Sequence, residues 1–219
     1  MGLLVVFAFW RSDTVGLSLI LLANLALVGG VTWYFAAMAL TYRRKEAAGA
    51  AVVVELGLAP DYAGEVGNGG YPCENVWQCY RGLLDGAEIT WLKVWVGSSR
   101  RGGTVWIAST KISPPFAQEF RIDASYAAKP VPAPHPRLPA NREIWWEPRD
   151  WVATWLDSLP EATAAALHAF LSEDRRTVVT GRVVFCFVPE LGLDGAPAAH
   201  AAFREITALA RRLRDSAEA

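Results

Sequence analysis

The residues that could bind a metal or catalyse a reaction are few and far apart in this sequence. The histidines His135, His168 and His200 lie in three separate segments, and Cys73 and Cys79 are spaced as C-x5-C. Zinc sites use short and fixed ligand spacings, which these residues do not show. We therefore expect no metal site and no bound cofactor.

The cysteines also point away from a disulfide-stabilised fold. Their number is odd, so the sequence offers no closed disulfide framework. Cys186 lies within the apolar run 183–188, where we expect a buried and unreactive thiol. Cys73 and Cys79 could pair if the domain lay outside the cytoplasm.

Hydrolytic and nucleotide-binding motifs are missing from the chain. It has no Gly-x-Ser-x-Gly elbow, and the glycine-rich segment 97–104 lacks both the lysine and the following helix of a phosphate-binding loop. The catalytic residues of an enzyme would therefore be unknown and would have to come together from dispersed groups. The candidates for such a site are Asp85, Glu88, Arg121 and His168.

A long uncharged stretch near the N-terminus predicts a membrane anchor. No charged residue occurs between Thr14 and Tyr42, and about 20 apolar residues are enough to cross a bilayer. We predict a short tail (1–13), a transmembrane helix (14–42) and a soluble domain (43–219). Aromatic and basic side chains suited to the bilayer surface flank this helix, namely Trp10, Tyr42, Arg43, Arg44 and Lys45.

The charges on either side of the anchor predict its orientation. Three consecutive cations follow it, whereas Arg11 alone precedes it and Asp13 partly offsets that charge. By the positive-inside rule, the protein should be a single-pass membrane protein with its C-terminal domain in the cytoplasm. A cleaved signal peptide is the alternative, since Ala37-Met38-Ala39 resembles a cleavage site, but the apolar region is too long for one.

The net charge excludes a general nucleic-acid binder. It is −1 for the whole chain, and beyond Lys45 the acidic residues outnumber the basic ones by 21 to 17. Nucleic-acid binding needs a surplus of cations to neutralise phosphates. The expected partners are membrane lipid and a further protein, with no nucleic acid.

The soluble part predicts an α+β fold with a mainly antiparallel sheet packed by helices. Alternation and turn residues predict a meander of strands, and apolar residues at helical spacing predict helices. The expected strands are 76–84, 88–96, 104–112, 119–124 and 175–188, the last bent at Gly181. The expected helices are 43–58, continuous with the anchor, 151–156, one ending near Leu171, and 194–214. Five prolines in 129–140 predict an extended loop.

The chain is rich in tryptophan, with ten residues of this type. Most of them should fill the core, and the remainder are expected to contact the membrane surface. We expect contacts at the surface from two aromatic residues and two cations in loops, namely Trp145, Trp146, Arg100 and Arg101.

Several short motifs follow the predicted anchor in a recognisable order. They are Glu55-Leu56-Gly57-Leu58, the run YRGLLDGAEI at 80–89, Thr110-Lys111-Ile112, Pro114-Pro115, Phe120-Arg121-Ile122, V-x-x-G-x-V at 178–183 and ALARRL at 208–213. In this order the chain resembles a group of bacterial membrane-anchored domains of unknown function. The resemblance covers most of 50–214, and the proline-rich segment and Trp145-Trp146 depart from it. It implies an α+β domain on an anchor and implies no activity.

These observations favour a non-enzymatic, membrane-tethered binding or scaffold domain that holds a protein partner or a lipid surface. One alternative is a membrane-anchored enzyme with a dispersed active site. Another is an accessory subunit of a larger membrane complex, in which Asn24, Gly29 and Gly30 would provide a surface for helix packing.

Overall fold

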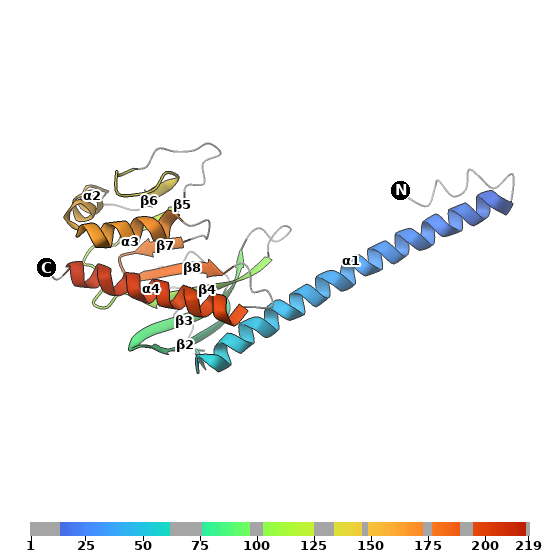
Figure 1. The fold of residues 1–219 in the computed structure, drawn as a ribbon, viewed down its shortest axis with the longest axis horizontal. Coiled ribbons are helices and arrows are strands. Elements are labelled where there is room, and N and C mark those ends of the chain that lie inside the picture. The colour runs from blue at the N-terminus through green and yellow to red at the C-terminus, as the bar shows by residue number, and fades with distance from the viewer. Residues whose placement is uncertain are drawn as a thin grey trace. The chain divides into compact units, whose positions relative to one another are not determined.

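The computed structural model describes residues 14–61, 76–96, 103–124, 134–145, 149–172, 177–188 and 195–217 (Figure 1). The chain divides into two compact units, Met1–Glu46 and Ala47–Ala219. Helix α1 (Thr14–Glu55) runs without interruption through this division, as the sequence predicts.

The part of α1 in the first unit is apolar and exposed. Leu25 is 67% exposed and Trp33 is 76% exposed. The polar side chains of Asn24 and Thr32 donate hydrogen bonds to carbonyls four residues earlier, so the helix satisfies them internally. The prediction of one N-terminal helix long and apolar enough to cross a membrane is confirmed.

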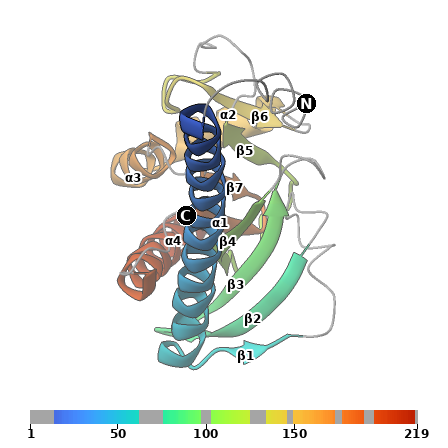
Figure 2. The same ribbon diagram turned by 90° about the vertical axis from the view of Figure 1, so that its right-hand side faces the viewer.

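The second unit is built on an eight-stranded antiparallel sheet, which confirms the predicted α+β class (Figures 1 and 2). The strands are β1 (Ala59–Pro60), β2 (Val76–Leu84), β3 (Ala87–Val96), β4 (Gly103–Lys111), β5 (Arg121–Ala124), β6 (Arg142–Trp145), β7 (Thr177–Thr180) and β8 (Val183–Val188). Their order in the sheet is β1-β2-β3-β4-β8-β7-β5-β6. The remaining helices are α2 (Arg149–Ser158), α3 (Glu161–Ser172) and α4 (Gly195–Ala217).

The sheet order corrects the predicted meander. Strands β2, β3 and β4 do follow one another, but β4 pairs with β8, and β5 pairs with β6 and β7. All six residues of β8 are buried, so this strand needs neighbours on both sides and occupies the centre of the sheet.

The segment 175–188 is predicted as a single bent strand, and its described part, 177–188, is a hairpin. Gly181 and Arg182 form its turn, and Val179 pairs with Val184. The hydroxyl oxygen of Thr180 accepts hydrogen bonds from the amides of Arg182 and Val183 and so stabilises the reversal. Glycine is needed at 181, because a Cβ there would lie 2.4 Å from the carbonyl oxygen of Gln118.

The two faces of the sheet carry different apolar clusters, as the alternation in β3 predicts. Ile89 and Trp91 belong to the larger core, together with side chains from all four helices. Leu92 and Val94 belong to a smaller cluster on the opposite face. The last turns of α1 contribute to the larger core through Val52, which is fully buried.

The described part of the proline-rich segment, 134–140, forms turns and is not extended as predicted. The amide of Leu138 donates to the carbonyl of His135, and both side chains are buried. The guanidinium of Arg137 donates to the carbonyls of Leu156 and Leu159, so it satisfies carbonyl groups at the end of α2. The segment therefore packs onto the second unit through these contacts.

Candidate functional site

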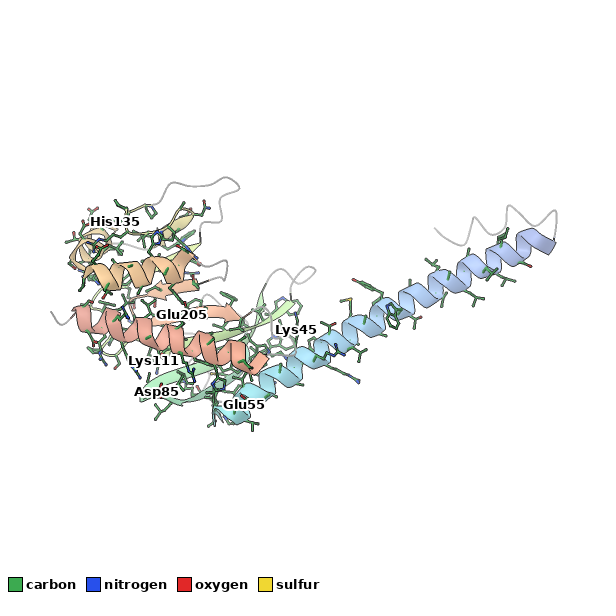
Figure 3. All side chains as sticks on the ribbon, viewed as in Figure 1. Lys45, Glu55, Asp85, Lys111, His135 and Glu205 are labelled. Atoms are coloured by element: carbon green, nitrogen blue, oxygen red, sulfur yellow. The ribbon has the colours of Figure 1, made fainter. Side chains whose placement is uncertain are left out.

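The residues predicted to meet the membrane are found in separate parts of the chain. Four of them are exposed on consecutive positions of α1, from Tyr42 to Lys45, and Figure 3 labels Lys45. Trp145 lies in β6 and is 38% exposed. The others, Trp10, Arg100, Arg101 and Trp146, lie outside the described residues.

The structure brings together two of the four dispersed catalytic candidates. Asp85 and Glu88 line the same cleft. Arg121 instead forms an ion pair with the buried Asp123. His168 lies on the exposed side of α3, where its ring is 3.2 Å from the hydroxyl of Ser172.

The cleft that contains Asp85 and Glu88 has a volume of about 440 Å³. It lies between the β2–β3 turn, the end of β4 and the C-terminal half of α4, and Asp85 and Lys111 lie below α4 in Figure 3. Its charged residues are Asp85, Glu88, Lys111, Arg211 and Arg214, and its hydroxyl groups belong to Thr110, Ser113 and Thr207. We call this the charged cleft.

The walls of the charged cleft are fixed by local structure. Asp85 and Gly86 have φ angles of 50° and 79°, the left-handed values that an Asp-Gly hairpin turn requires. Arg211 donates from its guanidinium to the carbonyl of Asp85, which connects this turn to α4. On the strand side, the ammonium group of Lys111 lies 2.7 Å from the carboxylate of Glu88.

A second candidate surface is an aromatic cluster formed by Trp77, Lys93, Trp95 and Trp106, which we call the tryptophan patch. The rings of Trp77 and Trp95 stack with centroids 6.0 Å apart and planes 12° apart. The ammonium group of Lys93 lies 5.8 Å from the Trp77 ring and 6.0 Å from the Trp106 ring, within the range of cation–π attraction. Trp77 is nonetheless 58% exposed, which is unusual for so large a side chain.

The tryptophan patch continues into the core and onto α1. Trp106 is only 5% exposed, and it stacks on Trp91 with centroids 5.0 Å apart. Its indole also lies against Gly49, since a Cβ on that residue would be 2.4 Å from the ring. The indole nitrogen of Trp91 donates to the carbonyl of Gly49 over 3.3 Å. The exposed Trp77 is thus backed by tightly packed structure.

The sequence predicts that most tryptophans lie in the core without singling out Trp77, and alternation alone does not reveal that this side chain is exposed. The pairing of β2 with β3 shifts register between Val76 and Gln78. An irregularity of this kind changes which face a side chain occupies. The only signal in the sequence is the large number of tryptophans in these strands.

Neither described cysteine resembles a nucleophile. Burial, and then the negative charge of Asp61, raise the pKa of the Cys79 thiol to about 11. The thiol is therefore protonated at neutral pH, and the thiolate is the reactive form. Cys186 is fully buried, as predicted, and Cys73 lies outside the described residues.

Among the described residues, no three His, Cys, Asp or Glu side chains are grouped so that they could hold a metal ion. In comparisons with known proteins, the chain matches no family model, no curated protein and no solved structure. The resemblance to bacterial membrane-anchored domains therefore stays a prediction. The charged cleft and the tryptophan patch are therefore the two features that bear on the function of this chain.

Proposed function

We propose that this chain is a single-pass membrane protein whose α+β unit is a binding domain held at the cytoplasmic surface of the bilayer. The observation that carries the proposal is the tryptophan patch. Tryptophan prefers the headgroup layer, because its ring is apolar and its N–H can still find a polar partner there. An exposed tryptophan held in place by stacking and by a neighbouring cation is suited to that layer.

The length of the intervening chain supports contact between this patch and the bilayer. Gly49 follows Tyr42 by seven residues, so their Cα atoms are at most about 25 Å apart even in an extended chain. Trp106 packs directly on Gly49. Trp106 of the patch thus packs on a residue that follows the predicted end of the span by only seven positions.

The charged cleft supports a binding role in preference to catalysis. The cleft residues that the structure describes include no histidine and no cysteine. Its cations instead have partners suited to positioning them, since Lys111 pairs with Glu88 and Arg211 donates to the carbonyl of Asp85 in the β2–β3 turn.

The contact can be tested by tryptophan quenching in full-length protein reconstituted into nanodiscs with lipids brominated near the headgroup. We expect Trp77→Phe together with Trp95→Phe to remove about half of the quenched emission, the rest coming from tryptophans of the anchor region. Trp145→Phe is the comparison, since β6 is at the far edge of the sheet from β2. If the double variant is quenched as strongly as the unaltered protein, or if only Trp145→Phe reduces quenching, the tryptophan patch does not contact the bilayer.

The proposed orientation follows from the cations at Arg43, Arg44 and Lys45. In a Cys73→Ser background, a cysteine introduced at the exposed position Ala165 should react with an impermeant maleimide only after the cells are broken. Ser12→Cys, in the tail, should react in intact cells. Maleimide labelling of the two remaining native cysteines should be low, because Cys186 is buried and burial raises the pKa of the Cys79 thiol to about 11. Reaction at position 165 in intact cells would show the opposite orientation.

A further inference from the structure

The charged cleft gathers three cations from two elements that are distant in sequence. Arg211 and Arg214 are separated by three positions on α4, so they share one face of that helix. Lys111 comes from the end of β4 and lines the same cleft. The cations thus come from two walls of a single cavity.

Arg211 retains capacity to donate hydrogen bonds within the cleft. A guanidinium carries five N–H donors, and the structure describes one hydrogen bond from Arg211, to the carbonyl of Asp85. Arg214 lines the cleft beside Arg211 and donates to the Asp215 carboxylate at 2.9 and 2.6 Å. The hydroxyl of Ser113, also in the cleft, adds another donor.

The carboxylates that accompany the cations are weak competitors for a ligand. Lys111 and Glu88 form their ion pair with side chains 46% and 39% exposed. Exposed pairs of this kind contribute little to stability, because water screens them and two long side chains must be ordered. A ligand carrying two negative charges could therefore take the place of Glu88 beside Lys111.

We propose that the charged cleft binds the phosphate group of a phosphate monoester. A monoester presents three terminal oxygens in a tetrahedral arrangement, which suits cations that approach from more than one direction, whereas a carboxylate presents two oxygens in one plane. A volume of about 440 Å³ exceeds what phosphate alone fills and lies in the range of small-ligand sites. The organic part of the ester would contact Leu83, Ala87 and Ala210.

This site is separate from the proposed membrane contact. Removing a cation and removing a neighbouring carboxylate are expected to change its affinity for phosphate in opposite directions. Removing a cation from the cleft should weaken phosphate binding. Removing the carboxylate of Glu88 should strengthen it, because Lys111 loses its competing partner and the cleft loses a repulsive charge. A purely structural network would lose stability in both variants without any change in affinity.

The test is the stabilisation of full-length protein in detergent by inorganic phosphate, measured as a shift in Tm against chloride at matched ionic strength. Binding to the folded state raises Tm with a concentration dependence that yields a Kd. We expect Arg214→Gln to raise that Kd about tenfold and Glu88→Gln to lower it several-fold. The matched control is Arg212→Gln, an exposed arginine of the same helix outside the cleft, which should leave the Kd unchanged.

The proposal is overturned if phosphate stabilises no more than chloride, or if Arg214→Gln and Arg212→Gln have equal effects. A second measurement separates the two sources of the phosphate group. If the ligand is a lipid headgroup, phosphatidate in the nanodiscs should compete with soluble phosphate for the cleft and raise the apparent Kd for phosphate. The Kd should not depend on that lipid if the ligand is a soluble ester. Failure of the quenching experiment would leave this result untouched, because the cleft and the patch share no residue.

Discussion

Replacing Gly49 with valine is expected to reduce the free energy of unfolding of the α+β domain by about 3 kcal/mol, the upper part of the range for overpacking a core. A Cβ at this position would lie 2.4 Å from two carbon atoms of the Trp106 ring. That ring cannot move aside, because it is stacked on Trp91 at 5.0 Å. The same change would disturb the hydrogen bond from Trp91 to the carbonyl of Gly49.

The effect of Gly49→Val can be measured by denaturant unfolding of full-length protein in detergent, followed by near-ultraviolet circular dichroism. The matched control is Ala50→Val, one position along the same helix and exposed. Its expected cost is below about 1 kcal/mol, the difference in helix propensity between alanine and valine. Similar losses in the two variants would mean that the close approach to Trp106 does not constrain the residue at 49.

Arg142→Met is expected to destabilise the domain by about 3 kcal/mol, since breaking a buried charge network leaves its remaining members unpaired. Arg142 is 6% exposed and donates to the carbonyl and hydroxyl of Thr177, at 2.9 and 3.0 Å, and to the carbonyl of Leu171. Burial lowers the pKa of Arg142, while the charge of Asp123 acts in the opposite direction. The side chain thus connects the end of α3 to the start of β7.

The control for Arg142→Met is Arg182→Met, which removes an exposed arginine that pairs with the exposed Glu119. That change should cost less than about 1 kcal/mol. Equal losses for the two arginines in the same unfolding measurement would contradict a structural role for Arg142.

The elements with strong local signals can be predicted from sequence. The limits of β2 agree with the expected 76–84, and α3 ends one residue beyond the expected Leu171. The turn at Asp85-Gly86 is predictable because few residues other than glycine tolerate its left-handed angles. In each case the determinant lies within a few residues of the element itself.

The neighbours of each strand cannot be predicted in the same way. The β7–β8 reversal at Gly181-Arg182 lacks the usual hairpin dipeptides, so its sequence favours one continuous strand. Strand β6 has no clear signal in the sequence, and its pairing with β5 is seen only in the folded sheet. Alternation identifies a strand and its faces, but it carries no information on which strand lies beside it.

The same limit applies to the candidate sites. Asp85 and Glu88 can be identified as candidates from the sequence, while Lys111, Arg211 and Arg214 complete the charged cleft from β4 and α4. These residues are brought together by the packing of α4 on the sheet, which no local pattern encodes. The predicted membrane contacts in loops give no indication of the tryptophan patch on β2, β3 and β4.

The central position of β8 also sets the order of events during synthesis. Trp106 of β4 pairs with Val188, so the sheet cannot be completed until at least the first 188 residues have left the ribosome. An N-terminal anchor would enter the bilayer long before that moment. Strands β2, β3 and β4 would then be synthesised and paired while their apolar faces are still uncovered. Pairing β4 with β8 is a slow step, because the two strands are far apart in sequence. Nascent chains halted before β8 should therefore be more accessible to chaperones and proteases than the complete chain.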